Sequence, residues 1–267
     1  MKRIALILAF AMSAALTSAA QDKSKTDAQG KPEAPKSEAP KTDAKHAALP
    51  TVDAIPEKHV KAVGGKEVIE KITSRSMKGS FDLEAFGVTG APVEMFAKAP
   101  NKSSTNIDVP NFGAVNRVFN GAAGWHSAPA SGLRELSGVE LAQIKRASDF
   151  YVDLNYNKHY AKMEVKGKEK VGSYETYVIE AAPAEGSPEK LYFDVNTGLL
   201  VRHDMETESP EGKAPSENYL DDYKVVDGVK IPHVIKYVNP MISWVIKFTE
   251  VKNNIEVDEA KFNKPSN

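Results

Sequence analysis

The sequence predicts a mainly β fold, an unclosed antiparallel β-barrel of about ten or eleven strands with helices plugging its concave face. The clearest evidence is residues 191–246, where four segments rich in β-branched and aromatic residues are joined by short turns. Asn196-Thr197-Gly198 forms a short hairpin connection, and Asp227-Gly228 supplies the positive φ that a type I′ turn requires. Successive antiparallel hairpins are therefore the building unit, and a sheet of that many twisted strands curls.

The other elements follow from hydrophobic periodicity. Apolar residues in 56–72 have the spacing of an amphipathic helix, but Gly64-Gly65 interrupts it, which favours two short helices. A second helical segment is expected over 137–149, where Ser137 and Glu140 match a capping box. Strands are expected at 75–86, 93–98, 103–109, 115–120, 161–171, 175–182, 191–195, 199–206, 219–226, 229–238 and 244–251.

The first 20 residues read as a secretory signal peptide. A basic start is followed by an apolar run over 4–16 and by Ser18-Ala19-Ala20, a small-residue cleavage pattern. The run is shorter than the roughly 20 residues of a transmembrane helix, so we expect a soluble mature protein without stable membrane insertion. Residues 21–48 have no aromatic or branched aliphatic residue and predict a disordered charged leader. One folded domain is expected over 49–267.

Composition excludes several classes of function. Without Lys2 and Arg3 of the signal peptide, 33 basic residues face 36 acidic ones, a formal charge of −3, so nucleic acid is not an expected partner. The absence of cysteine removes disulfides, thiolate metal sites and a lipid anchor on a cysteine after the cleavage site.

No constellation of catalytic residues emerges from the sequence. The six histidines lack the spacing of zinc ligands from one element, and nucleophile-elbow and phosphate-cradle motifs are absent. His203 and His233 are the only pair that we consider for a meeting across strands, and surface or hairpin positions are the simpler interpretation. Asp221-Asp222 point to opposite faces of a strand, and Glu206 and Glu208 are expected to be solvated. We therefore expect neither an enzyme nor a cofactor or metal; a hydrolase would need a serine, a histidine and a carboxylate in one cleft.

With catalytic and metal motifs set aside, the remaining candidates for function are apolar residues. One-sided stripes on the strands fit ordinary core packing, but a curled sheet not filled by its own side chains would hold an acyl chain. About 0.8 kcal/mol per buried methylene gives roughly 12 kcal/mol gross for sixteen carbons. Trp125 and Met241 are expected in loops at the mouth, Trp125 as a gate and Trp244 within a strand. The candidate lining and mouth residues are Phe81, Leu83, Met95, Phe119, Trp125, Phe193, Met241, Trp244 and Ile246.

Several short segments in a fixed order resemble the LolA/LolB-like superfamily of periplasmic lipoprotein carriers and outer-membrane receptors. They are HVKAVGG at 59–65, SRSMKG at 74–79, KAPNK at 98–102, FNG and GW within 119–125, VKGKE at 165–169, YFD and TGLL within 192–200, and DGVKIP at 227–232. The resemblance spans residues 49–267. It implies an unclosed β-barrel with a helical lid, a hydrophobic cavity for acyl chains and no enzymatic activity. It does not place the carrier's functional basic residue, for which Arg75 and Arg117 are the candidates.

Two functions stay open at this stage. The first is a monomeric periplasmic carrier that shields the acyl chain of a lipid or lipoprotein, in trafficking to the outer membrane. The second is an envelope interaction or assembly module with a packed interior, which binds an envelope protein and no lipid. A cavity of at least about 300 Å³ separates the first from the second.

Overall fold

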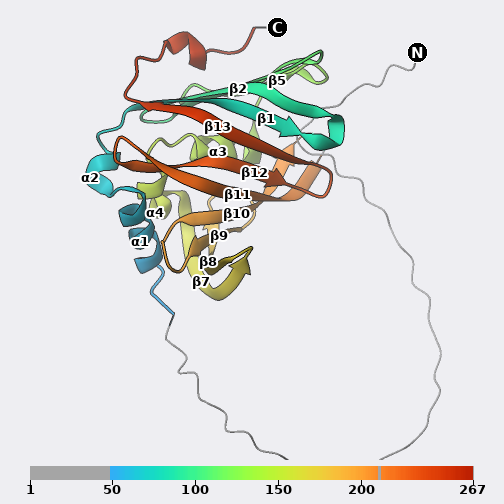
Figure 1. Ribbon diagram of the computed structural model, residues 1–267. Coiled ribbons are helices and arrows are strands. Elements are labelled where there is room, and N and C mark those ends of the chain that lie inside the picture. Colours follow the sequence, from blue (N-terminus) through green and yellow to red (C-terminus); the bar gives the residue numbers. More distant parts are fainter. Residues whose placement is uncertain (1–48, 210–211, 267) are drawn as a thin grey trace, which may run out of the picture. The chain divides into compact units, whose positions relative to one another are not determined.

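One antiparallel sheet of thirteen strands dominates the computed structural model, which describes residues 49–209 and 212–266 (Figure 1). The strand order is β6-β5-β4-β3-β2-β1-β13-β12-β11-β10-β9-β8-β7. The strands are β1 (Ser74–Leu83), β2 (Val88–Lys98), β3 (Lys102–Val109), β4 (Gly113–Phe119), β5 (Gly124–Ala128), β6 (Gly132–Glu135), β7 (Tyr160–Val171), β8 (Tyr174–Pro183), β9 (Glu189–Asp194), β10 (Leu200–Ser209), β11 (Gly212–Val226), β12 (Val229–Val238) and β13 (Ser243–Asn253). The two edge strands β6 and β7 do not pair, which confirms the unclosed barrel.

The helices are short. They are α1 (Ala54–Val63), α2 (Lys66–Ile69), α3 (Gly138–Ala147) and α4 (Tyr156–His159), with 3₁₀ turns η1 (Glu84–Phe86), η2 (Val152–Leu154) and η3 (Glu259–Phe262). None of these helices of the described chain has the length and apolar character needed to cross a membrane. The expected signal peptide and leader lie outside the described residues.

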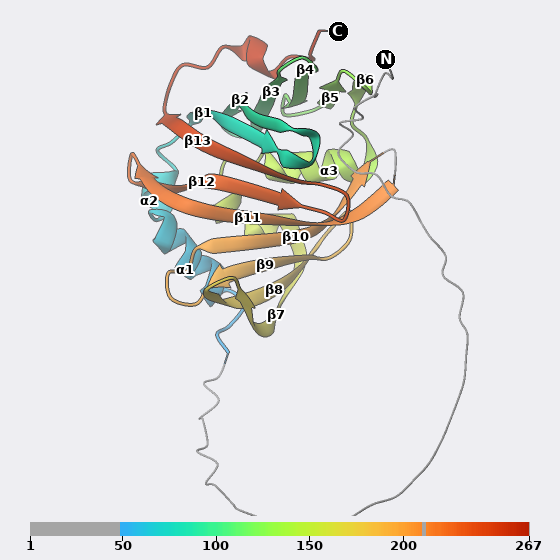
Figure 2. The same cartoon turned by 45° about the vertical axis from the view of Figure 1, so that its right-hand side comes forward.

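Helix α3 closes the concave side of the sheet. The chain builds β1 to β6 outward from the middle, passes through α3 to the opposite edge at β7, and returns strand by strand until β13 pairs with β1. Because α3 contacts both β5 and β10, it crosses the hollow between the two halves of the sheet. Figure 2 shows it on the inner side of the curved strands.

Local chemistry explains the predicted turns. Asp227 and Gly228 have φ of 50° and 83°, the pair of positive values that defines a type I′ hairpin. Gly64 and Gly65, with φ of 134° and 85°, end α1 and separate it from α2, as the glycine pair predicts. In β1 the register shifts between Lys78 and Gly79, where a Cβ on Gly79 would lie 2.0 Å from the Lys247 carbonyl oxygen. Only glycine permits that approach.

Three expectations need correction. The eleven predicted strands are present, but β5 and β6 were missed, because both are short, show weak alternation and begin with a glycine, Gly124 and Gly132. Trp125 lies on β5 and is only 8% exposed, so it is neither in a loop nor at a mouth. The Ser137 side chain makes no capping hydrogen bond.

Candidate functional site

A cavity of about 520 Å³ lies between the concave face of the sheet and α3. A smaller recess of about 180 Å³ adjoins it and shares five of its lining residues. These are Met95, Thr105, Arg117, Glu140 and Trp244. The larger volume exceeds the roughly 300 Å³ that a small-molecule site needs, which favours the carrier over the alternative with a packed interior.

The wall beneath the recess is apolar and built by cross-strand pairs. Ile235 of β12 faces Ile246 of β13, and Tyr237 faces Trp244 on the same two strands. The Tyr237 and Trp244 rings stack with centroids 5.0 Å apart and an angle of 7° between their planes. Met95 of β2 continues this surface on the other side of β1. These side chains form a continuous floor against which an aliphatic chain can lie.

The β4–β6 end of the cavity is basic. Arg117, His126 and Arg134 line the recess from three neighbouring strands. The Arg134 guanidinium donates two hydrogen bonds, of 2.6 and 2.7 Å, to the Glu140 carboxylate on α3. Glu140 therefore ties α3 to β6 instead of closing a capping box with Ser137. The Arg117 side chain is enclosed by protein, which lowers the pKa of its guanidinium by desolvation, yet it is exposed to the cavity.

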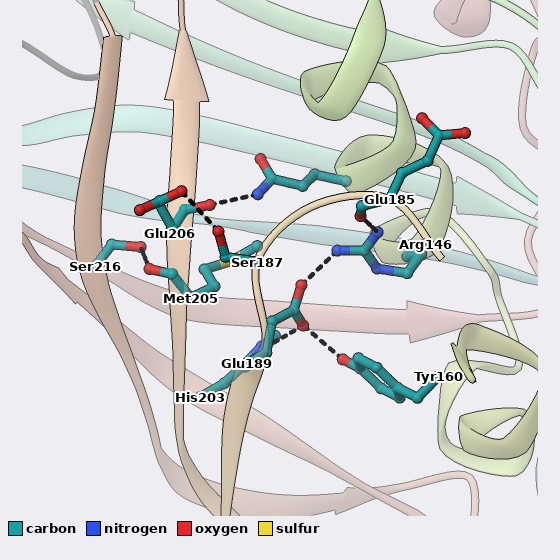
Figure 3. A network of polar contacts seen from close by, with 10 residues as sticks. Arg146, Tyr160, Glu185, Ser187, Glu189, His203, Met205, Glu206 and Ser216 are labelled. Carbon is teal, nitrogen blue, oxygen red and sulfur yellow. Dashed lines mark hydrogen bonds and ion pairs between the residues drawn. The ribbon is translucent and has the colours of Figure 1, made fainter. Parts of the chain in front are cut away.

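A second polar network anchors the other side of α3 (Figure 3). Glu189 of β9 is 2% exposed and pairs with Arg146 of α3. Its Oε2 atom accepts a 2.7 Å hydrogen bond from the Tyr160 hydroxyl and lies 2.8 Å from His203 Nε2. Burial opposes the charge of Glu189, but the contacts with His203, Tyr160 and Arg146 outweigh it and lower its pKa. On α3, Gln143 also donates to the Glu206 carbonyl at 2.6 Å.

A third network fixes α1 against the sheet. His59 Nδ1 lies 3.0 Å from the Gly198 carbonyl oxygen, and its Nε2 lies 3.1 Å from Asp153 Oδ1. Burial disfavours the Asp153 carboxylate, but His59 and Arg75 offset this, and the net result is a lowered pKa. Arg75 donates to the Asn253 side chain at 2.8 Å and lies over the Phe150 ring. These groups satisfy one another, which indicates a structural role.

The predicted lining residues fall into separate groups. Met95, Trp244 and Ile246 line the recess. Phe81, Leu83, Phe119 and Phe193 are at most 1% exposed and belong to core clusters, and none of them lines either cavity. Met241 is 52% exposed in the turn between β12 and β13, as predicted for a loop. Trp125 lines neither cavity.

The histidine pair considered from the sequence does not meet. His203 contacts Glu189, whereas His233 lies 2.9 Å from the Ile231 carbonyl oxygen. Within residues 49–209 and 212–266 no group of three or more histidine or carboxylate side chains is placed to hold a metal ion. Arg117 was already a candidate from the family resemblance, but the basic row was missed because β5 and β6 were not predicted as strands. Glu189 was missed because its partners Arg146, Tyr160 and His203 come from three other elements.

Comparisons with known proteins place this fold. No protein-family model and no curated protein matches the chain. A DUF1329 family protein from Desulfovibrio piger superposes with a TM-score of 0.54 and 14% identity, over 79% of this chain and 97% of that one. A LolA superfamily protein from Nitrosomonas europaea superposes with a TM-score of 0.52 and 12% identity, over 81% of this chain and 99% of that one. A putative outer membrane lipoprotein-sorting protein domain from Vibrio parahaemolyticus superposes with a TM-score of 0.52 and 12% identity, over 78% of this chain and 97% of that one.

The similarity to these three structures is similarity of fold, because the sequences are at most 14% identical. It spans nearly the whole of each solved chain, so no large part of those folds is missing here. The chain has the fold shared by LolA superfamily proteins and lipoprotein-sorting domains.

Proposed function

We propose that this chain is a non-catalytic binding protein of the periplasm that holds an acyl chain of a lipid or lipoprotein in its cavity. The observation that carries the proposal is a cavity of about 520 Å³ continuous with an apolar floor. The periplasmic location rests on the secretory pattern of residues 1–20. Traffic toward the outer membrane is the biological process that the LolA-type fold favours.

The physical basis is burial of methylene groups. Each one removed from water contributes about 0.8 kcal/mol, so even a chain of ten carbons in contact with the floor gains roughly 8 kcal/mol before the costs of association. No bond needs to be made or broken for such a guest to enter and leave. The polar networks around Glu189 and Asp153 are internally satisfied and hold the elements that enclose the cavity.

The two tryptophans supply a matched test. Trp244 lines the cavity, whereas Trp125 lies outside its lining on β5. Native mass spectrometry of protein purified gently from cell envelopes should show bound lipid, and a fluorescent fatty acid should bind the delipidated protein. Trp244→Ala should weaken that binding by about tenfold or more, about 1.4 kcal/mol, while Trp125→Ala should lower stability and leave affinity within about twofold. A protein that is always free of lipid and takes up no fatty acid would refute the proposal.

A further inference from the structure

The basic residues of the recess form one row across the sheet. Arg117 on β4 pairs in register with His126 on β5, which pairs with Arg134 on β6. In the other direction Arg117 pairs with Thr105 on β3, and Thr105 pairs with Met95 on β2. Side chains directly opposite one another share a face of the sheet, and all five line the recess. The row therefore passes from apolar to basic along a single wall.

The charges of this row do not cancel within the described residues. Arg134 has a bidentate partner in Glu140, the one carboxylate among the described residues that line the recess. The Arg117 side chain makes no hydrogen bond or ion pair with any residue of the described chain, although Glu140 lies near enough to raise its pKa in part. Two guanidinium groups thus face one carboxylate, and the unmatched positive charge is that of Arg117.

An unpaired guanidinium is costly in this setting. Arg117 is exposed to the cavity and adjoins its apolar floor, and the protein atoms around its guanidinium lower its pKa by desolvation. A neutral side chain would be the better residue if the cavity held only hydrocarbon. An anion brought by the guest would give the guanidinium the bidentate hydrogen bonds that its planar fork is built to donate.

We propose that Arg117 binds the anionic head of a single-chain amphiphile, a fatty acid carboxylate or an alkyl phosphate, whose tail lies on the floor made by Ile235, Trp244 and Ile246. This assignment rests on the proposed function, because it requires that the cavity admits an acyl chain. It adds the orientation of the guest, head at β4–β6 and tail toward β12–β13, and its chemical class. Neutral acylglycerols and alcohols lack the group that Arg117 pairs with.

The test compares three ligands with one tail. Palmitate, hexadecyl phosphate and hexadecanol are titrated into the delipidated full chain and into Arg117→Met, Arg117→Lys and Lys247→Met. Lys247 is the matched control, because it follows Ile246 on β13, points to the other face and is 58% exposed. Circular dichroism confirms that each variant is folded.

We expect the natural sequence to bind the two anions at least about tenfold more tightly than hexadecanol. Arg117→Met should abolish that preference and leave hexadecanol binding unchanged, and Arg117→Lys should keep a preference because it keeps the charge. Lys247→Met should change nothing. The ratio of palmitate to hexadecyl phosphate affinity identifies which head the site prefers.

Equal binding of all three ligands by the natural sequence would overturn the assignment while leaving the acyl-chain function intact. An equal loss of affinity for palmitate, hexadecyl phosphate and hexadecanol in Arg117→Met would also overturn the assignment. Failure of every ligand to bind the folded natural protein would refute the proposed function, and the assignment with it.

Discussion

Helix α3 depends on the buried Glu189 carboxylate, and Glu189→Gln tests this dependence. Gln keeps the shape of the side chain but removes the charge that Arg146 of α3 pairs with. Of the ten residues of α3, only Gln143 and Ile144 are buried, so apolar packing contributes little to holding the helix. We expect the substitution to lower the free energy of unfolding and to loosen α3 over the cavity.

The size of the effect follows from the burial of the partners. Breaking a buried pair by removing one charge costs about 3–5 kcal/mol, because the other charge is left without compensation. Glu189 is 2% exposed, but the Arg146 side chain is 14% exposed and also donates to the Glu185 carbonyl at 3.2 Å. These two features place the expected loss at the lower end, about 3 kcal/mol. The matched control, Glu164→Gln, removes a 53% exposed carboxylate from surface ion pairs with Lys162 and Lys166 and should cost at most about 1 kcal/mol.

Urea unfolding across a pH series measures both the loss and its origin. Because the folded-state pKa of Glu189 is lowered, its contribution is fully present above the unfolded value of about 4.3 and is lost as the pH falls through the folded value. The difference between the natural sequence and Glu189→Gln should therefore be constant above about pH 6 and shrink below about pH 4. A loss under about 1 kcal/mol at pH 7, or a loss that does not change with pH, would refute this account of how α3 is held.

Two further substitutions test the fold itself. Leu83→Ala should lower the free energy of unfolding by about 2–5 kcal/mol, whereas Met95→Ala, at a half-buried cavity wall, should cost less and weaken acyl-chain binding more, measured by denaturation and ligand titration. Gly79→Ala should destabilise by more than the roughly 1 kcal/mol typical of a point mutation, because its Cβ would lie 2.0 Å from a carbonyl oxygen; thermal unfolding unchanged within about 1 °C would show that the β1–β13 pairing relaxes freely.

Much of the fold was predictable because the turns carry their own chemistry. Asp227-Gly228 and Gly64-Gly65 need positive φ, and the structure places them where a hairpin turns and a helix ends. The missed strands β5 and β6 are five and four residues long, and their pairing depends on β4 more than on their own composition. Trp125 was misplaced for the same reason, since a residue beside Gly124 in a short segment is typical of a loop.

The candidate site was harder to predict than the fold. Alternation showed which strand residues are apolar, but it did not separate Phe81, which lines neither cavity, from Ile246, which faces it across the β1–β13 pair and lines the recess. The row of Arg117, His126 and Arg134 depends on register between strands, which the sequence does not state.

Three charged side chains that line the larger cavity, Glu189, Asp153 and Arg117, divide into two with partners and one without. Glu189 has three partners, and Asp153 pairs with His59; both carboxylates have lowered pKa values because their partners offset the cost of burial. The pKa of Arg117 is also lowered, but here desolvation is the leading cause, and Glu140, which opposes it, is held by Arg134. The charges that have protein partners explain how α1 and α3 are held, and they need no bound ligand to balance them. The Arg117 guanidinium has no such partner beside the apolar floor, and an anion carried by the ligand would supply one. For this reason the decisive variant is at Arg117 and not in the larger networks.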